Sequence, residues 1–303
     1  MIPFGKSIRV YLKDGTVTGI RFGEVVNQTI QCIACPRNRI GELKFNSEAN
    51  RPSVYFLFGN DENSGEPKTY IGEAENVFER LQSHLLNKEF WNEVIFFVSK
   101  DENLTKSHVK FLESRIIQTA ITTKRYKIDN GNQSQASSLP AADRDAMEEF
   151  LVYLKLLLGV FGHKLLEELT PTNSIATAVV NTSFSESSTV INNGNSVKNI
   201  ELFLNIGGLK ASAVYTDEGV VILKGSDAAK DIQTSLPMGY RETRQKLINN
   251  GVLKETENKY IFTDSYLFDT ASPAAAIVVG YSINGKNSWK NKNGLSLNEI
   301  EKL

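Results

Sequence analysis

The alternation of apolar and polar residues near the N-terminus predicts a small β unit over residues 1–46. Residues 7–12 alternate as in a half-buried strand, and Asp14-Gly15 has the composition of a turn. Residues 17–26 then return as a second strand, and Gln31–Ala34 supplies a third. We expect this unit to pack on the domain that follows it.

A β-hairpin is the next predicted element. Val54–Phe58 is an apolar run and Lys68–Ile71 is a second short strand. The segment between them, Asn60–Pro67, is rich in the residues that form turns. Val94–Val98 is a wholly apolar run and predicts a third strand.

Two helices are predicted around these strands. Apolar residues at helical spacing, with Val77 and Leu81 among them, predict a helix from Glu73 to Leu86. Acidic residues in its first turn suit a helix N-terminus. Thr105 is a plausible N-cap for a second helix that places Val109 and Leu112 on one face.

The pattern divides the remainder into three parts. A helix with an apolar stripe is predicted from about Pro140 to Leu158. Residues 171–199 are rich in Ser, Thr and Asn and predict a linker. Strand-like and helical runs then alternate to the end. The expected fold class is α+β, with these divisions: 1–46, 47–135, 136–170, 171–199 and 200–303.

Charge narrows the expected function. The 303 residues have a net charge of −1, so the chain has no global basic field. Residues 1–46 hold 7 basic and 3 acidic side chains, whereas residues 47–130 hold 11 basic and 13 acidic. Because phosphate contacts dominate nonspecific affinity, this balance disfavours a protein that coats DNA. A local nucleic-acid site remains compatible with it.

Other features indicate a soluble cytoplasmic protein. Cys32 and Cys35 have no second Cys or His pair at zinc-finger spacing, so we expect buried, reduced thiols. The N-terminus has no basic region followed by an apolar run. No apolar stretch reaches the length of a membrane span, and no membrane association is expected.

One group of polar side chains suggests phosphodiester chemistry. Tyr55 and Tyr70 lie on paired strands, and Arg80 and His84 are four residues apart on the next helix, so they share a face. A guanidinium suits a phosphate because its planar donors are two-pronged. Glu113 on the second helix offers one carboxylate, which suits a Mg²⁺ ion that keeps most of its waters.

The run SVYFLFG…KTYIGEAENVFERLQSH…FLESRII resembles the GIY-YIG nuclease superfamily, over roughly 80 residues. The resemblance implies a three-stranded sheet flanked by helices. It also implies roles for the hairpin residues. Tyr55 matches a proposed general base, Tyr70 matches a tyrosine that orients water or phosphate, and Gly72 matches a glycine that lets substrate approach the backbone.

The resemblance extends to the helices. Arg80 matches the phosphate-binding arginine, and His84 falls where relatives have His or Tyr that assists proton transfer. Glu113 matches the glutamate that holds Mg²⁺ or Mn²⁺. A downstream asparagine is usual in the family, and Asn130 is the candidate for substrate binding. Glu73 departs from the family, since many relatives carry Lys at that position.

The segment SPAAAIVVGYSINGKNSWKNKNGLSL is similar to a domain of unknown function that follows GIY-YIG modules in bacterial proteins. Together these resemblances imply a metal-dependent endonuclease, with DNA favoured over RNA, in restriction, defence or repair. The alternative is an inactive scaffold of this family that serves as a nucleic-acid or protein interaction module. The C-terminal domain would select substrate, a protein partner or a homo-oligomer.

Overall fold

The computed structural model describes residues 4–61, 64–131, 138–169 and 199–302. The chain forms two compact units, divided after Glu167. Each unit combines a β-sheet with helices, which confirms the expected α+β class. The predicted linker over 171–199 lies outside the described residues except for Asn199.

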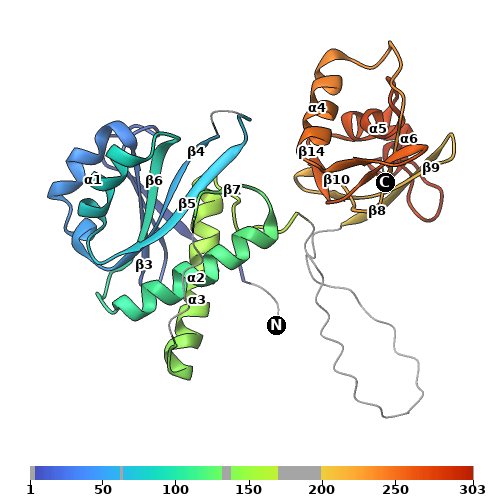
Figure 1. The fold of residues 1–303 in the computed structure, drawn as a ribbon. Helices are drawn as coiled ribbons and strands as arrows, with labels where there is room; N and C mark the ends of the chain where they lie inside the picture. The colour runs from blue at the N-terminus through green and yellow to red at the C-terminus, as the bar shows by residue number, and fades with distance from the viewer. Residues whose placement is uncertain (1–3, 62–63, 132–137, 170–198, 303) are drawn as a thin grey trace, which may run out of the picture. The chain divides into compact units, whose positions relative to one another are not determined.

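A seven-stranded sheet forms the centre of the first unit (Figure 1). Its spatial order is β1-β2-β3-β6-β4-β5-β7, and all neighbours are antiparallel except β5 and β7. The three strands expected from the nuclease resemblance are the block β6-β4-β5. The strands are β1 (Ile8–Leu12), β2 (Arg21–Val25), β3 (Ile30–Pro36), β4 (Ser53–Asn60), β5 (Pro67–Ala74), β6 (Trp91–Ser99) and β7 (Lys127–Ile128).

The N-terminal strands extend this sheet at its edge. β3 pairs with β6 over seven residues, from Ile30 opposite Ser99 to Pro36 opposite Glu93. The strands predicted within residues 1–46 thus continue the sheet of the domain on which this β unit was expected to pack. Pairing between segments about sixty residues apart leaves no local signal in the sequence.

Helices cover the two faces of the sheet. α1 (Val77–Asn87) and the 3₁₀ helix η1 (Arg37–Phe45) cover one face, where Tyr55 and Leu57 point. α2 (Lys106–Thr123) and α3 (Ala141–Val160) lie on the other, against Val54 and Phe56 (Figure 1). Because successive strand residues alternate between faces, each residue of β4 has a defined environment.

The start of α1 differs from the prediction. Glu73 belongs to β5, which continues to Ala74 because Ala74 pairs with Ser53 of β4. The helix begins only after Asn76, whose side chain accepts a hydrogen bond from the Glu79 N–H at 3.1 Å. An N-cap of this kind offsets one of the unpaired N–H groups at a helix start.

The second unit has two small sheets around its own core. The strand orders are β14-β10-β9-β8 and β11-β13-β12. α5 (Ala271–Val279) is almost wholly buried between them. The other elements are β8 (Ile200–Ile206), β9 (Leu209–Thr216), β10 (Gly219–Ile222), β11 (Asp227–Ala229), α4 (Met238–Asn249), β12 (Leu253–Glu255), β13 (Lys259–Phe262), β14 (Tyr266–Phe268), α6 (Gly285–Ser288) and α7 (Leu297–Ile300).

None of the helices in the described part of the chain is long and apolar enough to cross a membrane.

Candidate active site

Four of the predicted site residues meet on the α1 face of the sheet. Tyr55 comes from β4 and Tyr70 from β5, and their ring centroids are 6.1 Å apart. His84 of α1 lies 5.7 Å from the Tyr55 ring and 5.0 Å from the Tyr70 ring. Arg80, one turn earlier on α1, places its Nε 3.3 Å from the Tyr55 hydroxyl. The structure thus brings these residues into one cluster.

Gly72 makes room for the Tyr55 side chain. It lies directly opposite Tyr55 in the pairing of β4 with β5, on the same face of the sheet. A Cβ atom at position 72 would lie 2.4 Å from the Tyr55 hydroxyl oxygen. The glycine is therefore required by the tyrosine, whatever contact it makes with a substrate.

The hydrogen bonds assign a direction to the Tyr55 hydroxyl. The Arg80 Nε–H donates to its oxygen, because a guanidinium has no acceptor. The hydroxyl proton is then free to bond Nε2 of His84 at 2.8 Å, which requires an unprotonated Nε2. Burial, followed by the charges of Arg80 and Lys88, lowers the pKa of His84 to about 4. His84 is consequently a neutral acceptor at physiological pH.

Tyr55 itself holds its proton firmly. Its side chain is fully buried, and burial is the main reason that the pKa of Tyr55 is raised well above its usual range. The Tyr70 hydroxyl raises this pKa further, whereas Arg80 opposes the shift. An ionised Tyr55 is therefore strongly disfavoured. Of Tyr55 and His84, His84 is the residue that can accept a proton.

Two residues of α1 and its C-cap, Lys88, lie around the Tyr70 ring. Arg80 interacts with the Tyr70 hydroxyl, His84 packs beside the ring, and the Nζ of Lys88 lies 4.4 Å from its centroid. Lys88 is not among the residues predicted for the site. Its spacing of i, i+4 and i+8 with Arg80 and His84 was the available signal.

Glu113 comes from α2, the helix that packs on the other face of the sheet. It is half-buried on α2, the helix that packs against Val54 and Phe56, and it has interaction partners of its own. Glu73, which follows Gly72 on β5, lines the open cleft beside Arg80. The expected place of Glu113 in one site with the tyrosine cluster stays a prediction.

A metal ion would find few protein ligands here. Among the described residues, no three His, Cys, Asp or Glu side chains are clustered to hold one. A single carboxylate such as Glu113 matches Mg²⁺, which keeps several waters and shares its coordination with substrate phosphates. The residues fit a loosely held Mg²⁺ or Mn²⁺ better than a tightly caged ion.

Asn130 has a structural partner. Its Oδ1 accepts the Ile71 N–H at 3.1 Å and its Nδ2 donates to the Ile71 carbonyl at 2.7 Å. The side-chain amide thereby extends the hydrogen bonding along β5 from Thr69, where its pairing with β7 ends, to Ile71. Both polar ends of the amide thus bond the backbone of β5, and the expected role of Asn130 in substrate binding stays a prediction.

An open cleft of about 590 Å³ adjoins Arg80. Its lining is mixed in charge, with Glu73, Glu75 and Glu79 opposed by Arg80 and Lys106. The Lys106 ammonium lies 2.7 Å from Glu75. A phosphate that enters this cleft meets Arg80 together with three carboxylates.

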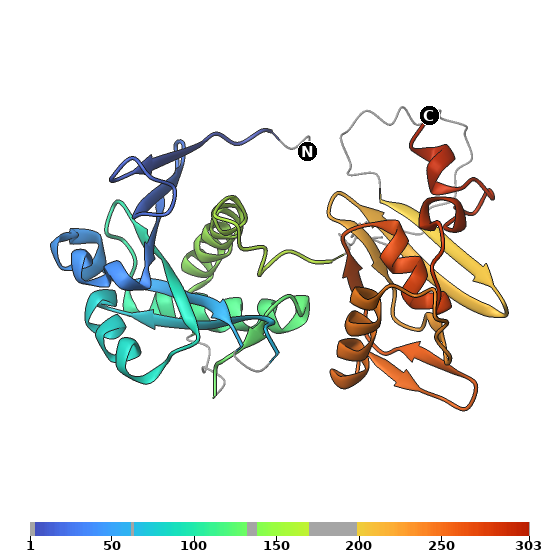
Figure 2. The same cartoon turned by 90° about the horizontal axis from the view of Figure 1, so that it is seen from above.

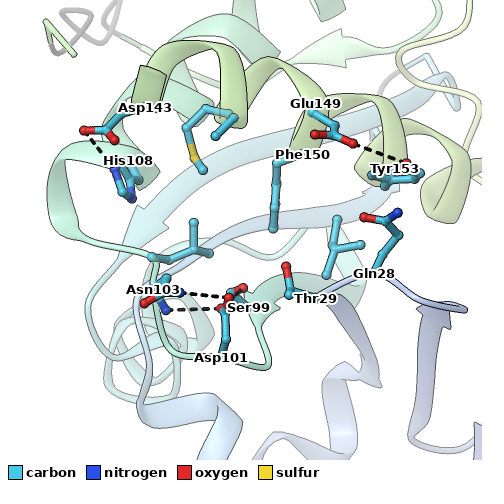
Figure 3. A pocket seen from close by; sticks show the side chains of 14 residues that line it. Gln28, Thr29, Ser99, Asp101, Asn103, His108, Asp143, Glu149, Phe150 and Tyr153 are labelled. Carbon is cyan, nitrogen blue, oxygen red and sulfur yellow. Dashed lines mark hydrogen bonds and ion pairs between the residues drawn. The ribbon is translucent and has the colours of Figure 1, made fainter. Parts of the chain in front are cut away.

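A second cavity, of about 330 Å³, lies on the α3 side of the same unit (Figure 3). Met147 and Phe150 form part of its apolar wall, and Asp101 and Asp143 lie at its polar parts. His108 also lines it, but Nδ1 of His108 accepts the Thr105 N–H in the capping box of α2. This cavity is lined by none of the four clustered residues.

The comparisons with known proteins concern only the second unit. No curated protein and no solved structure matches the chain. Residues 202–301 match the family model of a domain of unknown function, DUF4357. The expectation of such a domain at the C-terminus is thereby confirmed.

Proposed function

We propose that the chain is a divalent-metal-dependent endonuclease that hydrolyses phosphodiester bonds in DNA. The observation that supports this best is the hydrogen-bonded chain from Arg80 through the Tyr55 hydroxyl to His84. It joins an exposed guanidinium, which suits a phosphate, to a neutral imidazole that can take a proton. The order of these residues also follows the GIY-YIG pattern.

Each residue has a role that its contacts support. Arg80 binds the scissile phosphate and offsets the charge that develops on it. The neutral His84 draws the proton of Tyr55 as Tyr55 takes one from the attacking water, so no free tyrosinate is needed. Tyr70, held by the turns of α1, orients the water or the phosphate.

Glu113 of α2 is the residue that would hold the metal. When bound, Mg²⁺ or Mn²⁺ would supply Lewis acidity at the phosphate. β7 pairs with β5 at Lys68 and Thr69, and Asn130 bonds the backbone of Ile71, so the part of the β5 edge that a DNA strand would approach lies after Ile71.

Plasmid nicking in Mg²⁺ or Mn²⁺ tests the proposal. We expect wild type to nick, and Glu113→Ala and Tyr70→Phe to lose about 100-fold or more of the rate. Tyr153→Phe is the matched control, since its hydroxyl bonds only weakly, at 3.4 Å, to Glu149 on α3. If wild type is as inert as Glu113→Ala on duplex, branched and single-stranded DNA and on RNA, the enzyme proposal fails.

A second function has one observation in its favour. The three glutamates beside Arg80 repel a polyanion, and residues 47–130 are slightly acidic overall. These features suit a retained scaffold that binds a partner without cutting nucleic acid. Binding of a protein or nucleic acid that is unaffected by Tyr70→Phe, in a chain without nicking activity, would favour this alternative.

A further inference from the structure

The outer edge of β1 is a free strand edge with an unusual surface. β1 has β2 as its sole sheet neighbour among the described residues, and it forms one margin of the sheet (Figure 2). Its three central residues, Arg9, Val10 and Tyr11, are all exposed. The exposed fraction is 44% for Val10 and 60% for Tyr11. Apolar edges of this kind are prone to pair with another chain.

The backbone of β1 fixes which residues can pair outward. The Ser7 carbonyl accepts the Val26 N–H, and the Lys13 N–H donates to the Ile20 carbonyl. Odd-numbered residues of β1 therefore direct their backbone groups toward β2. In an antiparallel pair these groups alternate, so those of Ile8, Val10 and Leu12 point to the open side.

We propose that this edge joins a second copy of the chain by antiparallel pairing of β1 with β1, on a two-fold axis at Val10. Val10 has its N–H and carbonyl on the open side, so it can exchange both hydrogen bonds with Val10 of the second copy. An isologous contact of this type closes after two subunits.

The side chains of β1 are self-complementary in this register. Ile8 lies opposite Leu12 of the second copy, and Val10 lies opposite itself, which places apolar residues together. Arg9 lies opposite Tyr11 of the second copy, where a guanidinium can pack on an aromatic ring. Like charges directly opposite would be destabilising, and this register has none.

The charge on Arg9 does not protect the edge. In the single chain Arg9 is bound to Glu24 at 2.7 Å, and Glu24 also accepts Lys100 at 3.0 Å. The cation is thus compensated within its own sheet. A second copy is the occupant that the edge fits, because both its hydrogen bonds and its side chains match themselves.

Sedimentation of the full chain over a range of concentrations is the first test. We expect wild type to form a dimer, with a dissociation constant at or above roughly the micromolar range for so small a contact. Val10→Pro should be monomeric. Proline removes only the outward N–H of Val10 and leaves the ladder with β2 intact, as tolerated on edge strands. Val10→Lys, which places two ammonium groups opposite each other, should also be monomeric.

Cross-linking tests the register. Val10→Cys should form a disulfide-linked dimer on oxidation, because opposed residues in a hydrogen-bonded pair lie about 5.5 Å apart at Cα. Val17→Cys is the exposed control outside β1 and should cross-link much less. Cys32 and Cys35 are buried and do not compete. A monomeric wild type, a Val10→Pro dimer, or equal cross-linking at positions 10 and 17 would overturn the proposal.

Discussion

The hydroxyl oxygen of Tyr55 lies 2.8 Å from Nε2 of His84, and both side chains are buried. We predict that Tyr55→Phe lowers the nicking rate by roughly 100-fold or more, since the proton path through the hydroxyl is lost. The variant should also lose about 1–3 kcal/mol of stability, because Nε2 of His84 is left buried without a partner. Single-turnover nicking and urea unfolding measure the two effects.

Tyr153→Phe serves as the control for Tyr55→Phe, because it deletes a hydroxyl on α3 away from the cluster. Tyr153→Phe should leave both the nicking rate and the free energy of unfolding nearly unchanged. If Tyr55→Phe retains full activity while Tyr70→Phe does not, the proton path is assigned to the wrong tyrosine.

The depressed pKa of His84 predicts a loss of stability in mild acid. The folded state holds His84 neutral down to about pH 4, whereas the unfolded chain binds a proton near pH 6.5. The stabilisation is complete above pH 6.5 and is lost as the pH falls toward 4. It amounts to at most about 3 kcal/mol.

The check is the free energy of unfolding of wild type and His84→Asn from pH 4 to 8. The difference in the free energy of unfolding between wild type and His84→Asn should become smaller below pH 6.5, because the variant lacks the titrating imidazole. A difference that is independent of pH would contradict the neutral, buried state of His84.

Gly72→Ala should damage the cluster sterically. The new Cβ would meet the Tyr55 hydroxyl at 2.4 Å, so β5 or the tyrosine must shift. We expect a destabilisation of about 1–3 kcal/mol and a loss of activity. Gly41→Ala is the matched control, since a Cβ at position 41 would have no neighbouring atom within 4 Å. Equal melting temperatures for the two variants would refute the predicted clash.

Asn130→Ala should act on the backbone of β5. Losing both amide bonds to Ile71 is expected to cost about 1–3 kcal/mol and to speed hydrogen exchange at the Ile71 N–H. Asn130→Asp keeps an acceptor for that N–H and removes the donor to the carbonyl, so it should retain more of the protection. A stable Asn130→Ala variant that only binds DNA less tightly would favour the expected role in substrate binding instead.

Local patterns predicted much of this structure. The hairpin of β4 and β5 followed from turn residues between two apolar runs. Ser296 and Glu299 have the spacing of a capping box, and they form one at the start of α7. Asn284-Gly285 has the composition of a tight turn, yet Asn284 caps the short helix α6. Asn-Gly suits a helix start as well as a turn, and tertiary packing decides between them.

Features that depend on residues far apart in the chain could not be predicted from local sequence patterns. Glu73 has the charge expected of a helix start, yet its backbone continues β5 because β4 extends far enough to pair with it. The placement of Glu113 depends on which face α2 covers, and helix periodicity alone does not specify this. The resemblance located the individual residues of the site but gave no sheet face for Glu113.

Because β6 lies between β3 and β4, the sheet limits which truncated fragments of the chain can fold. A fragment that begins at residue 47, where the motif suggests a self-contained module, would strip β3 from β6. The fragment would leave the edge of β6 unpaired, and residues Val94–Val98 of this strand are all apolar and fully buried in the complete chain. Such a fragment should express as inclusion bodies, so a usable truncation of this protein must retain the N-terminal strands and end after Glu167.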